Sequence, residues 1–128
     1  MSKLSEKPTI FVTRRWPDAA EDALRQYFNP TFNPKDVPLT EAQIAAGFAC
    51  HDALAPTVSD QINAEIIAAG AAGSGRLIAN FGVGVNHIDL SSAASAGLAV
   101  TNTPGVLTDA TADLALTLML MISRRAGE

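Results

Sequence analysis

The stretch Leu77-Ile78-Ala79-Asn80-Phe81-Gly82-Val83-Gly84-Val85-Asn86-His87-Ile88-Asp89 decides the fold of this 128-residue chain. Its first five residues are nearly all apolar, as is typical of a parallel strand covered on both faces of its sheet. The two glycines predict a loop with positive φ angles and close backbone approach, and Asp89 can cap a helix that ends near residue 96. Strand, loop and helix in this order are the repeating unit of an α/β fold.

Strands and helices alternate along the rest of the chain in the same way. We expect strands at residues 9–13, 31–33, 48–54, 77–81 and 98–101, and helices at 17–28, 40–46, after the capping pair Ser59-Asp60, at 89–96 and at 108–126. Right-handed connections leave few ways to arrange such a chain. The sequence therefore predicts a flavodoxin-like, doubly wound, parallel five-stranded sheet of order 2-1-3-4-5 that ends in a long apolar helix.

Composition excludes several classes of protein. An apolar content of 48% suits a single domain with a real core, and a net charge of -4 argues against a nucleic-acid partner. The apolar run at 114–122 is too short for a bilayer, which needs roughly 20 residues, and residues 1–8 do not form a signal peptide. We therefore expect a cytoplasmic protein without a membrane partner.

The single cysteine and one of the two histidines fall in the strand expected at residues 48–54. Cys50 cannot form an intrachain disulfide, and we expect it to be buried as a small apolar residue. His51 has no companion at metal-ligand spacing, so the sequence predicts no metal site.

Loops at the carboxyl ends of parallel strands carry the chemistry in a fold of this kind. Main-chain N–H groups around Gly82 and Gly84 predict a nest for a small carboxylate. A dinucleotide loop is disfavoured, because His87 stands where a third glycine is needed and no acidic residue follows about 20 residues later. We interpret His87 as a structural turn residue and Asp89 as a helix cap. The turn 103–105 either is only a rigid loop or aims the amino end of the last helix at an anion.

Two segments resemble a known family at this point. Residues 80–89 resemble a G-x-G-x-(D/N)-x-I-D element, and residues 102–113 resemble an N-x-P-x-x-x-x-x-x-x-A-(D/E) element. Both have the spacing found in D-isomer-specific 2-hydroxyacid dehydrogenases, most similar to the glyoxylate/hydroxypyruvate reductase branch. The opening 10–14 followed by Pro17 also fits this resemblance.

The resemblance implies an oxidoreductase that transfers a hydride between NAD(P)H and the C2 carbon of a small 2-oxo acid. It implies substrate contacts at Val83, Gly84 and the loop matching Leu54, a cofactor contact at Thr108, and a homodimer through residues 108–126. Residues 1–107 would be the substrate-domain portion, and 108–128 a crossing helix leading to a nucleotide-binding domain that this sequence does not contain. No residue matches the family's catalytic Arg, Glu and His, so we assign no catalytic residue and expect this chain alone to be inactive. The choice between NAD and NADP stays open.

An alternative interpretation is that the chain has no enzymatic activity. The chain would then be a flavodoxin-like binding or dimerisation module. In both readings we expect self-association, because apolar residues cover too much of the circumference of helix 108–126 for a single buried stripe.

Overall fold

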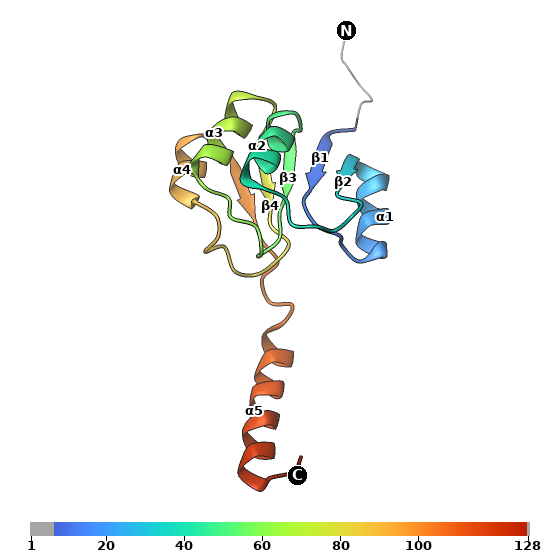
Figure 1. The fold of residues 1–128 in the computed structure, drawn as a ribbon, viewed down its shortest axis with the longest axis vertical. Coiled ribbons are helices and arrows are strands. Elements are labelled where there is room, and N and C mark those ends of the chain that lie inside the picture. Colours follow the sequence, from blue (N-terminus) through green and yellow to red (C-terminus); the bar gives the residue numbers. More distant parts are fainter. Residues whose placement is uncertain (1–6, 128) are drawn as a thin grey trace.

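The computed structural model describes residues 7–127 and shows helices and strands in strict alternation (Figure 1). In chain order they are β1 (Thr9–Val12), α1 (Asp18–Tyr27), β2 (Asn29–Phe32), α2 (Glu41–Ala49), β3 (Ala53–Ala55), α3 (Ala64–Ala72), β4 (Leu77–Ala79), α4 (Leu90–Ser95), β5 (Ala99–Thr101) and α5 (Thr108–Arg124). All pairings are parallel and the sheet order is β2-β1-β3-β4-β5. The predicted α/β class and strand order are confirmed.

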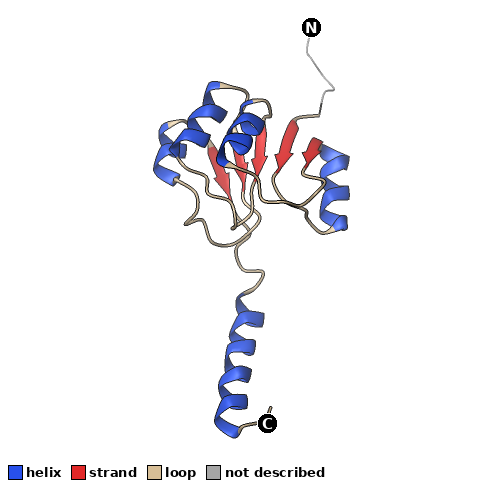
Figure 2. Cartoon of the chain, viewed as in Figure 1, coloured by secondary structure: helices blue, strands red, loops and turns tan. Residues whose placement is uncertain are grey.

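Side chains of successive strand residues enter two different apolar clusters, because they point to opposite faces of the sheet. Ile10, Val12, Ala53 and Ala55 form one cluster, against which Trp16, Leu24 and Phe28 pack from α1 and its flanks. Leu54, Ile78 and Ile88 belong to the other cluster, together with Ile44 and Phe48 of α2 and Ile66 and Ile67 of α3. Helices therefore cover both faces of the sheet (Figure 2).

Local capping agrees with the sequence at two helices. The hydroxyl of Thr40 accepts from the backbone N–H of Gln43, whose side chain accepts from the N–H of Thr40, so α2 starts with a capping box at the residue where the sequence predicts the helix to begin. Asp89 caps α4 by accepting from the N–H of Ser92. At the other end of α4, Gly97 has a φ of 69°, the left-handed conformation in which glycine ends a helix at little cost.

The expected strand at 48–54 is largely wrong. Residues up to Ala49 belong to α2, the strand is only Ala53–Ala55, and Cys50 is an exposed helix end rather than a buried strand residue. The reason is the packing of Phe48, which is fully buried against Gly70 and Gly75, where added Cβ atoms would lie 2.3 and 2.6 Å from its ring.

Two further expectations of the same kind are corrected. His51 lies in the turn after α2, where its ring contacts the carbonyl of Gly47 at 2.7 Å and the hydroxyl of Thr31 at 2.8 Å. Asn63 rather than Ser59 or Asp60 caps α3, since its side chain accepts from two backbone N–H groups there. The carboxylate of Asp60 instead accepts hydrogen bonds from Thr13 and Thr57.

The description of the last helix as a long apolar crossing helix is also corrected. α5 has 17 residues, carries Asp109, Asp113 and Arg124, and begins after Leu107 without a side-chain cap. Among residues 7–127, no helix is long and apolar enough to cross a membrane. All of α5 is exposed, and it projects away from the sheet and the other helices (Figure 1).

The close contact between Phe48 and Gly70 gives a test of this packing. Gly70→Ala would place a methyl group inside the van der Waals radius of the Phe48 ring, so we expect a loss of about 1–3 kcal/mol in the free energy of unfolding. Urea denaturation measures this change. Gly84→Ala is the control, because no atom lies within 4 Å of its added Cβ. Equal stability of the two variants would contradict the proposed packing.

The cap of α4 predicts a pH dependence of stability. Hydrogen bonds from the Ser91 hydroxyl and from the N–H and hydroxyl of Ser92 lower the pKa of Asp89 from 3.8 to about 2. A lowered folded-state pKa adds stability above the unfolded-state value, and this stability is lost as pH falls from about 4 toward 2.

In Asp89→Asn this titration is absent, so the melting temperature should fall less steeply over that range than in the unaltered protein. Thermal unfolding followed by circular dichroism at several pH values measures the slope. Asp113→Asn on α5 makes the same charge change and is the control. A slope for Asp89→Asn that matches that of the unaltered protein would exclude this role of Asp89.

Candidate functional site

The carboxyl ends of β1, β3, β4 and β5 form one edge of the sheet, and the loops that leave them are tied together by main-chain hydrogen bonds. The N–H of Phe81 donates to the carbonyl of Pro56 at 2.9 Å, and the N–H of Thr103 donates to the carbonyl of Gly82 at 3.0 Å. The loop after β4 is therefore fixed between the loops after β3 and β5, at the edge where α/β folds bind ligands.

Asn80, buried at the end of β4, organises the loop that follows it. Its side-chain N–H₂ group donates to the carbonyls of Gly82 at 3.1 Å and Gly84 at 2.9 Å. Carbonyl groups only accept hydrogen bonds, so the amide atom that faces them must be the nitrogen. The other atom of the side-chain amide is then Oδ1, which can only accept. His87 Nε2 lies 2.9 Å from this Oδ1, so Nε2 carries a proton.

His87 is thus a structural turn residue, as predicted, with its neutral form held as the Nε2–H tautomer. Burial lowers the pKa of His87, and the nearby carboxylate of Asp60 opposes part of this shift. Uncharged His87 serves as a fixed donor to Asn80. The residue does not pair with Asp89, whose carboxylate is used to cap α4.

The main-chain N–H groups of Val83 and Gly84 form the part of this edge that can bind an anion. Neither donates a hydrogen bond within residues 7–127. The carbonyls beside them do accept, including that of Val83, which receives the side-chain N–H₂ of Asn102 at 2.9 Å. Both residues are exposed. Their unpaired donors suit a carboxylate oxygen.

The expected positive φ occurs at one of the two glycines of this loop. Gly82 has a φ of 159°, whereas Gly84 is not among the positive-φ residues. A Cβ on Gly82 would lie 2.8 Å from Cγ1 of Val58, whereas a Cβ on Gly84 would meet no atom within 4 Å. The space in front of Gly84 is open to a ligand.

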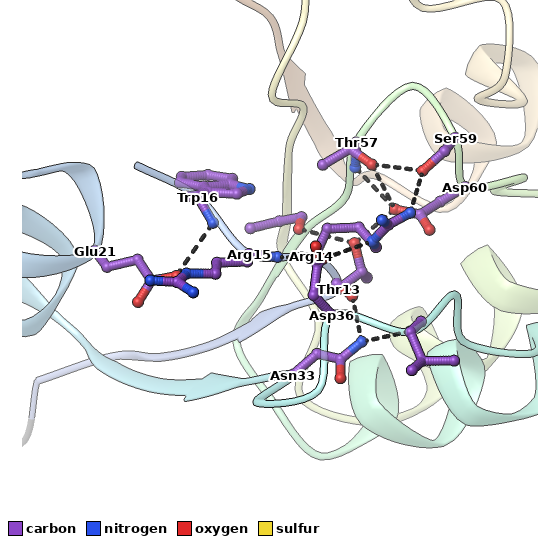
Figure 3. A network of polar contacts seen from close by, with 12 residues as sticks. Thr13, Arg14, Arg15, Trp16, Glu21, Asn33, Asp36, Thr57, Ser59 and Asp60 are labelled. Atoms are coloured by element: carbon purple, nitrogen blue, oxygen red, sulfur yellow. Dashed lines mark hydrogen bonds and ion pairs between the residues drawn. The ribbon is translucent and has the colours of Figure 1, made fainter. Parts of the chain in front are cut away.

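A polar network joins the loops after β1, β2 and β3 beside this site (Figure 3). The carboxylate of the buried Asp60 accepts from the hydroxyl of Thr13 at 2.5 Å and from the N–H of Thr57 at 2.8 Å. Arg14 donates to Asp36 at 2.9 Å and to the Ser59 hydroxyl at 3.2 Å.

This network leaves its acidic groups with partners. The hydrogen bond from Arg14 is the largest cause of the lowered pKa of Asp36, followed by the backbone N–H of Arg15. The hydrogen bonds of the buried Asp60 and the exposed Asp36 therefore brace these loops.

Of the residues predicted from the sequence, Val83 and Gly84 lie together in the loop after β4. Leu54 is in β3 with its side chain fully buried, so the residue of this strand connection that faces Gly82 is the exposed Val58. Thr108 is the exposed first residue of α5, which follows the loop after β5.

Sequence reasoning missed the supporting residues Asn80, Asn102 and Val58. Asn80 and Asn102 each follow an apolar strand directly, and a polar amide at that position was the available signal. Nothing in the sequence indicates that Val58 faces Gly82.

Comparison with known proteins identifies a family for this chain. Residues 10–125 match the family described as D-isomer specific 2-hydroxyacid dehydrogenase, catalytic domain. A glyoxylate reductase of Thermococcus kodakarensis is 37% identical over 122 residues, which cover 95% of this chain and 36% of that protein. One from Korarchaeum cryptofilum is 36% identical with the same coverage.

Solved structures give the same result. A putative D-isomer specific 2-hydroxyacid dehydrogenase, NAD-binding, from Polaromonas sp. JS6 66 has a TM-score of 0.82 and 37% identity, covering 91% of this chain and 36% of that one. An NADPH-dependent glyoxylate/hydroxypyruvate reductase from Sinorhizobium meliloti, in complex with NADP and malonate, has a TM-score of 0.72 and 28% identity, covering 91% and 34%. The chain spans about a third of the length of these relatives. It belongs to the D-isomer specific 2-hydroxyacid dehydrogenase family and matches the catalytic domain of that family.

Proposed function

We propose that this chain provides the substrate-binding portion of an NAD(P)-dependent oxidoreductase that reduces a small 2-oxo acid of the glyoxylate or hydroxypyruvate type. The observation that supports this proposal best is the pair of unpaired N–H groups at Val83 and Gly84, presented beside open space. Two neutral donors can bind one carboxylate, and each hydrogen bond to a charged acceptor is worth about 1.5–3 kcal/mol. Relatives named glyoxylate reductases support the substrate class.

The walls of the site suit a small ligand. Val58 is 62% exposed and stands opposite Gly82, while Phe81 is stacked on Trp16 with 4.7 Å between ring centroids. We assign Val58 to an apolar wall beside the carboxylate. Leu54, buried beneath the edge, supports the loop that carries Val58.

The residues described here do not fit a dinucleotide by themselves. A pyrophosphate group needs a glycine-rich turn and a free helix amino end. In this loop His87 stands at the third glycine position and is bonded to Asn80, and the amino end of α4 is occupied by the carboxylate of Asp89. These residues alone therefore do not account for hydride transfer. Thr108 stays a proposed contact near the nicotinamide cofactor. The proposed division is a substrate portion at 1–107 and a connecting helix at 108–128.

The carboxylate site can be tested by titrating ¹⁵N-labelled protein with glyoxylate. We expect the largest amide chemical-shift changes at Val83 and Gly84, and none with glycolaldehyde, which lacks the carboxylate. Gly84→Ala places a methyl group in the space that the ligand would use. Its affinity should fall at least about tenfold, as expected for the loss of one charged hydrogen bond.

The stability of Gly84→Ala should stay close to that of the unaltered protein, because its added Cβ meets no atom within 4 Å. Amide shifts that lie elsewhere, or an unchanged affinity of Gly84→Ala, would overturn the proposed site.

We also propose self-association through α5, as a homodimer. Leu114, Leu118 and Ile122 lie on one side of this helix at spacings of four residues and are 58%, 48% and 78% exposed. At 3.6 residues per turn, Asp113, Thr117 and Arg124 form a narrow polar stripe about 120° around the helix from this side. An apolar helix side of this kind favours burial against a partner.

Leu118→Glu should shift the sedimentation equilibrium toward monomer, because it introduces a charge into the apolar side. Thr117→Glu adds the same charge on the polar stripe and should leave the equilibrium unchanged. A strictly monomeric unaltered protein at high concentration would contradict the dimer. It would also remove the support for the alternative function as a dimerisation module.

A further inference from the structure

Three successive carbonyl groups of the loop after β4, those of Gly82, Val83 and Gly84, accept hydrogen bonds, although Val83 and Gly84 are exposed. The carbonyl of Gly82 accepts from the N–H of Thr103 and from Asn80, that of Val83 from Asn102, and that of Gly84 from Asn80. Hydrogen bonds to the rest of the edge therefore fix the orientation of three successive peptide groups.

Each of these bonds also fixes an N–H group. In a trans peptide, the carbonyl of one residue and the N–H of the next point in opposite directions in the same plane. The structure contains no cis peptide bond among its described residues. The Val83 carbonyl points toward Asn102, so the N–H of Gly84 points away from Asn102. The Gly82 carbonyl points toward Thr103, so the N–H of Val83 points away from Thr103.

The two N–H groups differ in how they are held. The Gly82–Val83 peptide has two partners, the main chain of Thr103 and the side chain of Asn80. The Val83–Gly84 peptide has one, the side chain of Asn102. Removing the Asn102 amide frees one of the two peptides and leaves the other in place.

We propose that Asn102 is a positioning residue for substrate binding, which acts by aiming the N–H of Gly84 at the substrate carboxylate. This inference rests on the proposed carboxylate site. Asn80 performs the same task for the N–H of Val83, and His87 keeps the Asn80 side chain in the required orientation by donating to its Oδ1.

Asn102 is the better residue to test, because it is exposed and its loss leaves no buried polar group. In Asn102→Ala, glyoxylate should still shift the amide resonance of Val83, but the shift at Gly84 should be lost. The affinity should fall about tenfold, the value expected for one charge-assisted hydrogen bond. A general loss of structure would instead weaken both amide shifts together.

Asn102→Asp gives a second variant of the same shape that has no N–H to donate, and it should behave like Asn102→Ala. Asn86→Asp is the matched control. It adds the same charge to the exposed end of the loop after β4, and the Asn86 side chain makes no hydrogen bond within residues 7–127. It should keep both amide shifts and most of the affinity.

The outcomes separate this inference from the proposed function. If the unaltered protein shows no glyoxylate-dependent shift at Val83 or Gly84, the carboxylate site itself is wrong. If the unaltered protein binds and Asn102→Ala retains the Gly84 shift and the affinity, the site stands and the role of Asn102 is overturned. An equal loss of glyoxylate affinity in Asn102→Asp and Asn86→Asp would assign the effect to the added charge, and would also overturn the role of Asn102.

Discussion

The side-chain amide of Asn80 is the interaction on which the geometry of the candidate site depends. From one buried position it bridges two carbonyls of the following loop and accepts from His87. A buried amide with all its groups paired is a rigid element, since leaving any of them unpaired costs about 1–3 kcal/mol. The pairing of β4 with β3 and β5 then places this rigid loop between its neighbours, so the position of the site follows from the sheet and its orientation follows from Asn80.

The sequence predicted the parts of the fold that local patterns determine. Strand order follows from alternating elements and right-handed connections, and the caps at Thr40 and Asp89 follow from side chains that can reach nearby N–H groups. The apolar run beginning at Phe48 is different, because a short apolar run suits a buried helix as well as a strand. The choice is made by Gly70 and Gly75, more than twenty residues away, which leave room for the Phe48 ring.

The candidate site divides in the same way. The contacts at Val83 and Gly84 were predicted from the family resemblance, and the glycine-containing loop after a strand favours the same place. The roles of Asn80 and Asn102 depend on main-chain carbonyls that only the folded loop brings within reach. Leu54 lies in β3, where the alternation of side chains directs it into the core. Val58 instead faces Gly82 because it lies beyond the strand, where no periodicity predicts direction.

For the proposed anion site, the carboxylates of this acidic chain must be kept away from the ligand. Asp60 accepts from Thr13 and Thr57, and Asp36 is held by Arg14. Asp89, the acidic residue nearest in sequence to the loop, directs its oxygens to Ser91 and Ser92. Each carboxylate is thus turned toward donors of the protein, and the donors left over at the edge are main-chain N–H groups. Neutral dipoles held in place by two asparagines can attract a carboxylate, so the proposed anion site is compatible with a net charge of -4.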